Sequence, residues 1–336
     1  MYLLSPVAGH HFLGPGEVYV LDIHRVGSGL AAITSDQKLA LFNPARLDDG
    51  PISLLPTNHG NLRCLKPFDW LNSVVSTAGE DGSVSIWDLR EDPLKAQVLR
   101  FQAAEAPIVS LACELRSHAI AVGTELYDHA ASILLWDVRG SPSQRTRYTE
   151  VHSDDVTELR FHPTEAPNIL LSGSTDGLVN IYDTRIVDED DVIIQTLNHG
   201  SVHHAGFLSA TEVYALSHDE KFAVFNLEET YEKGTPVADF GDVRRELECQ
   251  YASNVTSKVD GSGAIIGVGS QARQMFQLVF LTRGSSPNSW MFDKSSSVGL
   301  PGGHGEEIVR AFCFYDDEQV VFTAGEDGNV KAWRPN

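Results

Sequence analysis

The chain has 336 residues, of which 46 are acidic and 25 basic, so its formal net charge at pH 7 is -21. Such a charge repels phosphate backbones and anionic lipids, which argues against direct binding to nucleic acid or to a membrane surface and favours a basic protein partner. The other interpretation is that the acidity only keeps the protein soluble.

The spacing of the cysteines and the length of the apolar runs bear on where in the cell the protein is expected. Cys64, Cys113, Cys249 and Cys313 are scattered and form no Cys-x-x-Cys pair, and the first residues lack the charged and apolar regions of a secretory leader. Reduced thiols in the cytosol or nucleus are therefore expected. No apolar run approaches the roughly 20 residues that a membrane-spanning helix needs.

Taken in chain order, the predicted elements are a first strand at residues 2–7 and then a series of similar β-hairpins. Asp36 is followed six residues later by Phe42, and Asp219 in the same way by Phe225. The full pattern, with an Asp-Gly turn, occurs in residues 78–88 (AGEDGSVSIWD), 173–183 (GSTDGLVNIYD) and 324–333 (AGEDGNVKAW). Asp-Gly supplies the positive φ angles of a tight hairpin turn, and the alternation after it is typical of a strand.

Two further hairpins keep the shape but depart from the pattern. In residues 123–137 the turn is longer before Trp136, and residues 267–279 have lost both the Asp and the Trp, which leaves Phe276 or Leu278 in the aromatic's place. The seven positions recur every 43 to 57 residues, slightly more than the 40 to 45 residues of a compact four-stranded unit. Seven such repeats predict seven sheets in a ring.

The start of several repeats carries a histidine, and with it the hairpins resemble the WD-repeat family. The openings are Asn58-His-Gly60, Val151-His152, Asn198-His-Gly200 and Gly303-His304; repeats of that family contain Gly-His and Trp-Asp pairs. The resemblance implies an all-β fold, one seven-bladed β-propeller of four-stranded WD-repeat blades over residues 1–336. The resemblance is strongest to one subgroup of the WD-repeat family, for which no biochemical activity is defined. The segments that carry it lie in the central blades, at residues 149–157, 160–163, 172–180 and 217–220.

Closure of the ring follows from where the repeats stop. The chain ends at Asn336, directly after the third strand of the last blade. Residues Tyr2 to Val7 are predicted to supply the missing outermost strand of that blade. Such closure leaves only short, protected sheet edges.

In three repeats a His, a hydroxyl residue, an Asp and an aromatic recur at matching separations. The sets are His59, Thr77, Asp81 and Trp87; His152, Ser172, Asp176 and Tyr182; and His304, Thr323, Asp327 and Trp333. A nucleophile, a base and an orienting acid would use the same residue types, but a hydrolase needs one such site in a cleft rather than a copy in each blade. The resemblance implies buried hydrogen-bond chains instead, and no catalytic residue is predicted.

One surface signal is acidity along a rim. In a WD propeller the blade openings and the hairpin turns share the top rim, and the carboxylates beside them are Glu80, Asp154, Asp155, Glu306, Glu307 and Glu326. They predict a mouth for a Lys- and Arg-rich segment; the alternative is that they are solvated charges. Acidic residues at 48–49, 188–191 and 228–229 are expected on the opposite rim, which favours a broadly negative particle over a single acidic pocket.

A second signal is an arginine two residues after Asp in Trp-Asp-x-Arg. Arg90, Arg139 and Arg185 occupy this position in three consecutive repeats, with Tyr in place of Trp in the third. The pattern resembles one by which some WD propellers dock on the adaptor of cullin-RING ubiquitin ligases. The alternative is a local ion pair to the preceding Asp, which would stabilise the blade without a partner.

These observations predict a non-enzymatic scaffold with no cofactor and no metal. The His10-His11 and His203-His204 pairs lack a Cys or a carboxylate at metal-ligand spacing. The predicted role is that of an escort or assembly factor, a monomer within a larger complex, which binds a basic protein segment on its top face. The alternative is a substrate receptor of a cullin-RING ubiquitin ligase.

Overall fold

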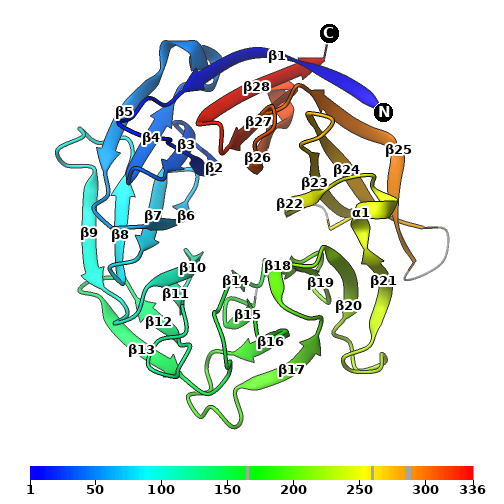
Figure 1. The fold of residues 1–336 in the computed structure, drawn as a ribbon. Helices are drawn as coiled ribbons and strands as arrows, with labels where there is room; N and C mark the ends of the chain where they lie inside the picture. The colour runs from blue at the N-terminus through cyan, green and yellow to red at the C-terminus, as the bar shows by residue number, and fades with distance from the viewer. Residues whose placement is uncertain (164–165, 259–260, 285–288, 336) are drawn as a thin grey trace.

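The computed structural model describes residues 1–163, 166–258, 261–284 and 289–335, and it confirms the seven-bladed propeller (Figure 1). Each blade is an antiparallel sheet of four strands, with the first strand beside the central axis and the fourth on the outside. Blades 1 to 5 are separate four-stranded sheets, whereas blades 6 and 7 are joined into one sheet of eight strands.

The first three blades occupy residues 20–148. Blade 1 consists of β2 (Val20–Val26), β3 (Gly29–Thr34), β4 (Lys38–Phe42) and β5 (Pro51–Pro56), with the 3₁₀ helix η1 (Pro44–Asp49) before its last strand. Blade 2 consists of β6 (Leu62–Asp69), β7 (Val74–Gly79), β8 (Ser83–Asp88) and β9 (Gln97–Gln102). Blade 3 consists of β10 (Ile108–Glu114), β11 (Ala119–Thr124), β12 (Ile133–Asp137) and β13 (Ser143–Tyr148).

The other four blades follow in chain order, and the last takes its fourth strand from the N-terminus. Blade 4 consists of β14 (Glu158–Phe161), β15 (Ile169–Gly173), β16 (Leu178–Asp183) and β17 (Ile193–Asn198), and blade 5 of β18 (Val202–Phe207), β19 (Glu212–Ser217), β20 (Lys221–Asn226) and β21 (Pro236–Asp242). The short helix α1 (Val243–Glu246) leads to blade 6, which consists of β22 (Tyr251–Ser257), β23 (Gly263–Ser270), β24 (Met275–Arg283) and β25 (Trp290–Pro301). Blade 7 consists of β26 (Val309–Tyr315), the 3₁₀ helix η2 (Asp316–Glu318), β27 (Val320–Gly325), β28 (Asn329–Pro335) and β1 (Tyr2–His11).

Strand β1 closes the ring, as predicted, but it is longer than the predicted strand and makes a second contact. It pairs antiparallel with β28 from Leu4 to His11. Its first residues also pair in parallel with β25, Tyr2 with Val298 and Leu3 with Gly299. A Cβ at Gly299 would lie 2.8 Å from the Met1 sulfur and 2.9 Å from Leu3 Cδ2, so these two side chains pack directly over the glycine. The N-terminus therefore fastens blade 6 as well as blade 7.

The strand register of blade 6 corrects one detail of the sequence interpretation. In blade 7 the residue after the inner-strand bulge is aligned, across the second strand, with Val330 of the third strand, and Trp333 follows three residues later. In blade 6 the residue after the bulge at Ser253 is aligned in the same way with Leu278, so the position equivalent to Trp333 is Leu281. Leu281 is fully buried. It therefore replaces the aromatic, and neither Phe276 nor Leu278 does.

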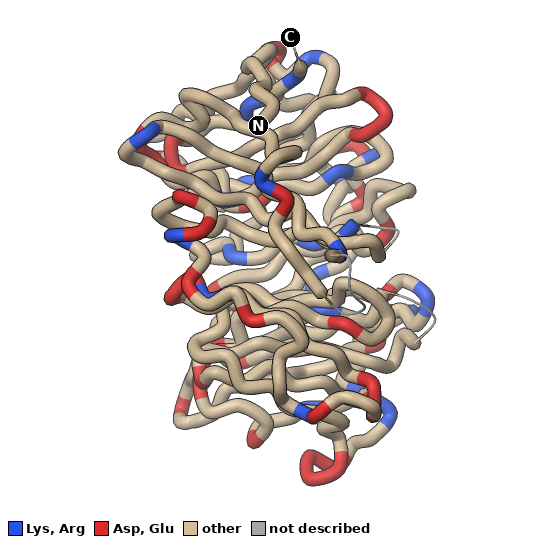
Figure 2. Tube along the Cα trace, turned by 90° about the vertical axis from the view of Figure 1, so that its right-hand side faces the viewer, with Lys and Arg blue, Asp and Glu red and all other residues tan. Residues whose placement is uncertain are grey.

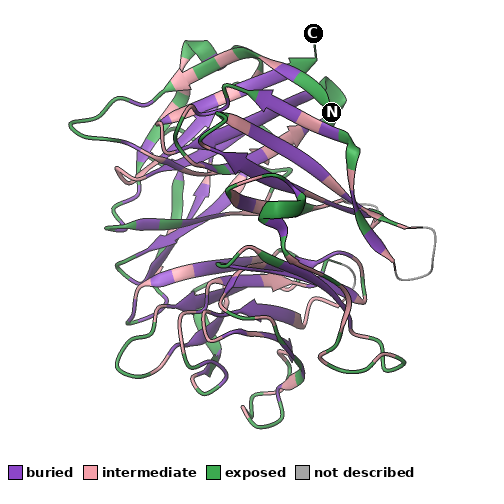
Figure 3. Ribbon diagram, turned by 45° about the vertical axis from the view of Figure 1, so that its right-hand side comes forward, coloured by how far each residue is buried: buried purple, intermediate pink, exposed green. Residues whose placement is uncertain are grey.

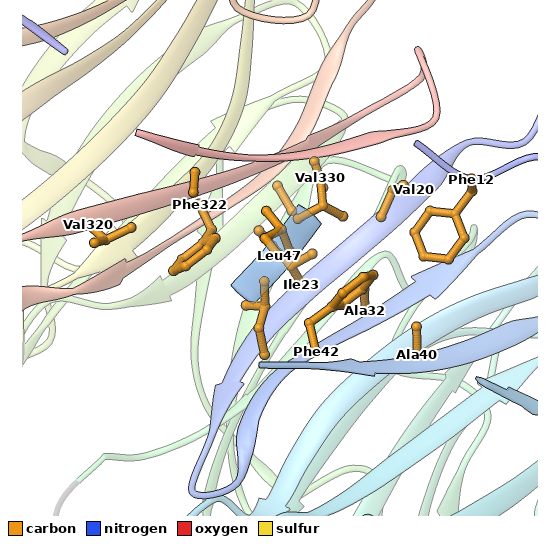
Figure 4. Packing of buried hydrophobic residues seen from close by; sticks show 14 of the residues in the cluster. Phe12, Val20, Ile23, Ala32, Ala40, Phe42, Leu47, Val320, Phe322 and Val330 are labelled. Atoms are coloured by element: carbon orange, nitrogen blue, oxygen red, sulfur yellow. The ribbon is translucent and has the colours of Figure 1, made fainter. Parts of the chain in front are cut away.

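The core lies between the blades. Seven clusters of buried apolar residues occur in the described part of the chain, one in each gap between neighbouring sheets. Figure 4 shows the gap between blades 7 and 1, where Phe322 and Val330 face Val20, Ile23 and Phe42. The burial colours of Figure 3 follow this arrangement, with buried strands and exposed connections. No helix in the described ranges is long and apolar enough to cross a membrane.

Candidate functional site

The first predicted set of residues forms a buried chain of hydrogen bonds in blade 2. The indole Nε1 of Trp87 donates to Thr77 Oγ1 over 2.8 Å, and Thr77 Oγ1 lies 2.9 Å from His59 Nε2. The other ring nitrogen, Nδ1, lies 3.1 Å from Asp81 Oδ1 in the hairpin turn. The chain thus links the third strand, the second strand, the blade opening and the turn.

Blades 7 and 4 repeat this arrangement. In blade 7, Trp333 Nε1 donates to Thr323 over 2.8 Å, and His304 lies 2.8 Å from Thr323 and 2.5 Å from Asp327. In blade 4, the distances from His152 are 2.6 Å to Ser172 and 2.9 Å to Asp176, and Tyr182 Oη lies 2.7 Å from Ser172 Oγ.

These three hydrogen-bonded sets stabilise their blades and do not form catalytic sites. The hydroxyls of Thr77, Ser172 and Thr323 belong to residues with no exposed surface, so a substrate cannot reach them. Burial lowers the pKa of His59 and His304, although the hydrogen bond and charge of the partner Asp oppose the shift. A neutral imidazole that donates from one nitrogen and accepts at the other satisfies every member of the chain.

The six predicted top-rim carboxylates have different surroundings. Antiparallel strands place the segment before each inner strand and the turn between the second and third strands on one rim, here called the top rim. Two of them hold backbone amides: Glu80 accepts from Asn61 N over 2.9 Å, and Asp155 from Leu126 N over 2.7 Å. Asp154 Oδ1 accepts from the amide of Asp155. These three carboxylates therefore also shape their own loops.

The other three predicted carboxylates lie beside the junction of blades 7 and 1. Glu306 and Glu307 are exposed, and Glu326 pairs with Arg310 over 2.6 Å. A cavity of about 350 Å³ opens there, and the carboxylates that line it are Glu307, Glu326, Asp327 and Glu17. We call this cavity the junction pocket. The structure brings Glu307 and Glu326 together, while Glu80, Asp154 and Asp155 belong to the rims of blades 2 and 4.

Glu17 and Tyr19 complete the junction pocket, and the sequence interpretation did not single them out. Tyr19 Oη donates to Glu17 Oε2 over 3.1 Å. This hydrogen bond, and then the charges of Glu17, Glu326 and Glu307, raise the pKa of Tyr19. All three carboxylates line the same cavity as Tyr19. Leu13, also in the wall, leaves 82% of its surface exposed.

The three arginines of the Trp-Asp-x-Arg pattern each bind the Asp two residues earlier. Nε of Arg90 donates to Asp88 over 2.9 Å, and Arg139 and Arg185 bind Asp137 and Asp183 in the same two-pronged way. The side chains remain 52%, 67% and 73% exposed. The pairing explains the pattern locally, and Arg90 also donates from Nη1 to Asn72 Oδ1 over 3.1 Å.

Acidic residues also lie away from the top rim. Figure 2 shows the ring edge-on, with acidic segments on both of its sides. Residues 188–191 and 228–229 lie in connections between third and fourth strands, on the rim opposite the top rim. The charge is thus broadly distributed, and the junction pocket stands out because its carboxylates converge rather than because acidity is confined to it.

The two neighbouring histidines His203 and His204 have different partners. His204 binds Glu158 Oε2 and the carbonyl of Ser253, both over 3.0 Å. His203 lies between two other imidazoles, with ring centroids 4.2 Å from His204 and 5.0 Å from His218. Within the described ranges, no group of three or more His, Cys, Asp or Glu residues is arranged to hold a metal ion.

This stack predicts an acid-sensitive step. Burial, and then the charges of His204 and His218, lower the pKa of His203 from 6.5 to about 2. Because the pKa is lower in the folded state, protonation favours unfolding: the stability is present above pH 6.5 and is lost as the pH falls below it. Between pH 7.5 and 5.0, His203→Asn should therefore lose less stability than the parent protein, by at most about 2 kcal/mol.

Urea unfolding at the two pH values measures this effect, and His129→Asn is the matched control. His129 is exposed and has a positive φ of 67°, which asparagine tolerates. An equal loss of stability in both variants would show that His203 does not set the acid sensitivity.

Comparisons with known proteins agree with the geometry. The family described as WD domain, G-beta repeat matches residues 51–88, 143–183 and 296–334. An uncharacterized WD repeat-containing protein of Schizosaccharomyces pombe is 31% identical over 330 residues, which cover 95% of this chain and 96% of that protein. One of Saccharomyces cerevisiae is 34% identical over 263 residues, 77% of this chain and 64% of the relative.

Two further likenesses bear on the subgroup and the fold. The central blades predict a likeness to WD repeat-containing protein 89, and a WD repeat-containing protein 89 homolog of Dictyostelium discoideum confirms it, at 26% identity over 96% of this chain and 85% of the homolog. A chain in the crystal structure of a mitotic checkpoint complex superposes with a TM-score of 0.72, at 18% identity, over 98% of this chain and 91% of that chain. At that identity the likeness concerns the fold alone.

Proposed function

Because the chain belongs to the WD-repeat family, whose propellers are in general non-catalytic scaffolds for protein interaction, we propose that it captures a Lys- and Arg-rich segment of a protein partner on its top rim. All four cysteines are free thiols, which fits a reducing compartment. The proposed role is an escort or assembly factor of the cytosol or nucleus, and the propeller acts without catalysis as a monomer within a complex.

The junction pocket is the observation that carries this proposal. Four carboxylates line a cavity of about 350 Å³, and only Glu326 among them also pairs with an arginine. Asp327 lies 3.5 Å from Lys331 Nζ and is bound to His304, so Glu17 and Glu307 keep the most freedom to meet a ligand. A Lys or Arg side chain would gain from these charges and from the face of Tyr19.

A charge-removal experiment tests the proposal. The probe is a fluorescein-labelled peptide of 12 residues rich in Lys and Arg, titrated with the full chain and followed by fluorescence anisotropy. The double variant Glu17→Gln, Glu307→Gln should weaken binding about tenfold, because two charge-assisted contacts are lost. Binding to the parent protein should also weaken when the salt concentration rises from 50 to 300 mM.

The control is the double variant Glu228→Gln, Glu229→Gln, which removes the same charge from the opposite rim. Its affinity should stay within a factor of two of the parent. An equal loss in both double variants would mean that the probe senses only the net charge, and the junction pocket would then have no part in recognition.

The alternative, a substrate receptor of a cullin-RING ubiquitin ligase, depends on the exposed side chains of Arg90, Arg139 and Arg185. Equivalent exposed positions on three consecutive blades would suit an adaptor. If affinity purification recovers a cullin adaptor and Arg139→Ala removes it, the receptor interpretation gains. Loss of the local pair with Asp137 alone should change stability by less than about 1 kcal/mol, because the arginine is exposed.

A further inference from the structure

The turn between the second and third strands of blade 3 is longer than the same turn in the other blades. It spans the eight residues 125–132, between β11 and β12, whereas the corresponding turns of the other six blades have three or four residues. We call it the blade 3 hairpin. The four strands of blade 3 pair as those of the other separate sheets do, so the propeller does not need the extra residues. Loops held on a rigid scaffold are frequent sites of binding.

The tip of the blade 3 hairpin has a regular geometry. Tyr127 and Ala130 exchange both of their backbone hydrogen bonds, each over 3.0 Å. The two residues between them, Asp128 and His129, have positive φ angles of 48° and 67°. Two central residues with positive φ are typical of a tight two-residue hairpin turn. The extra residues therefore form a small hairpin of their own.

The base of the blade 3 hairpin is bound to the segments that precede blades 3 and 4. The amide of Glu125 donates to the carbonyl oxygen of Pro107 over 3.0 Å. The amide of the next residue, Leu126, donates to Asp155 Oδ1 over 2.7 Å. Because these contacts already fix the loop, a partner that binds it does not bear the entropic cost of ordering it.

The blade 3 hairpin exposes two large side chains. Leu126 is 45% exposed and Tyr127 is 58% exposed. Neither belongs to any of the seven buried clusters of the described residues, and the residue paired with Tyr127 across the turn is the small Ala130. Burial of such side chains by a partner is favourable, and tyrosine is enriched among the residues that dominate interfaces.

The unpaired charges beside the blade 3 hairpin are negative. Asp128 stands at its tip, and Asp155, with Asp154 next to it, lies at its base. Within the described ranges, none of these three carboxylates forms an ion pair, whereas Arg63 at the base is paired with Glu125 over 3.5 Å. An apolar partner residue on this hairpin would thus have negative charge on either side, which favours basic residues next to it.

We propose that the blade 3 hairpin binds a partner segment in which a large apolar residue stands between Lys or Arg residues, with the apolar side chain against Leu126 and Tyr127. A second copy of this chain is a poorer occupant, because two chains of net charge -21 repel each other. Two side chains also cover far less than the roughly 800 Å² per partner of a stable interface. The inference rests on the proposed capture of a basic segment and adds selection for an apolar residue within it.

Two labelled peptides of equal charge test the proposal by fluorescence anisotropy with the full chain. Both are rich in Lys and Arg, and they differ only at the central position, which is Leu in one and Ser in the other. The parent protein should bind the Leu peptide at least about fivefold more tightly, because the leucine is partly buried. The double variant Leu126→Ser, Tyr127→Ser should reduce this preference to less than about twofold and leave the affinity for the Ser peptide unchanged. Tyr127→Phe, which keeps the ring, should retain the preference.

The double variant Leu71→Ser, Leu94→Ser is the matched control. These leucines are 67% and 96% exposed in connections of blade 2 on the opposite rim, so the control should keep the preference for the Leu peptide. Both double variants should unfold at the Tm of the parent, because all four residues are exposed. Equal binding of the two peptides by the parent, or a preference that persists in the hairpin variant, would overturn this inference and leave the capture of a basic segment intact. Failure of both peptides to bind would overturn both.

Discussion

Deletion of residues 1–11 should lower the free energy of unfolding by at least about 5 kcal/mol. The deletion removes the ladder between β1 and β28, from Leu4 to His11, and the parallel pairs with β25. Each lost backbone hydrogen bond contributes about 0.5–1.5 kcal/mol net, and Leu4, which is buried beside Trp333, contributes about 2 kcal/mol more. The loss should appear as a lower Tm and as a lower urea midpoint in circular dichroism.

A pair of point variants separates pairing from packing in this region. Leu4→Asp places a charge in the buried cluster and should be strongly destabilising, whereas Leu3→Asp, at a residue that is 54% exposed, should change stability by less than about 1 kcal/mol. A truncated protein with unchanged Tm would contradict the closure of the ring by β1.

Replacement of Arg283 by Met should lower the free energy of unfolding by about 3–5 kcal/mol. Arg283 on β24 binds both carboxylate oxygens of Glu212 on β19, and its guanidinium lies 4.5 Å from the ring centroid of Trp290. Glu212 is 3% exposed. Without the arginine, the Glu212 charge would stay buried, and the side-chain donors that the described residues leave it are Ser209 Oγ at 3.1 Å and Trp290 Nε1 at 3.2 Å. Urea unfolding measures the loss at this contact between blades 5 and 6.

Two control variants test whether the unpaired charge of Glu212 causes the loss of stability. Glu212→Gln combined with Arg283→Met removes the unpaired charge and should recover part of the stability. Arg244→Met breaks the pair with Asp242, where both side chains are more than 40% exposed, and should cost less than about 1 kcal/mol. If the Arg283 and Arg244 variants are equally stable, burial of Glu212 does not determine the strength of the contact.

The repeated features of the fold could be predicted because they are local. An Asp-Gly turn and an aromatic six residues later lie within one hairpin, so Asp81 and Trp87 indicate their blade without knowledge of any other. The sixth blade has no such turn, and its register is visible only in the pairing of β22 with β23 and of β23 with β24, whose partners lie up to 19 residues apart, as Gly263 and Thr282 do. The sequence alone therefore indicates Phe276 or Leu278 for the place of the aromatic, where the structure has Leu281.

The candidate sites were predicted only in part because their members come from different blades. Glu307 and Glu326 could be selected as neighbours of the repeated motif. Glu17 lies in the connection that precedes the first blade, and no repeat marks it.

The central claim, capture of a basic segment on the top rim, is tested most directly by carbodiimide cross-linking of the affinity-purified full chain. Carbodiimide joins a carboxylate to an amine that it touches, without a spacer. The account predicts that mass spectrometry finds partner lysines joined to Glu17 and Glu307. Cross-links confined to residues 188–191 and 228–229 on the opposite rim would contradict it.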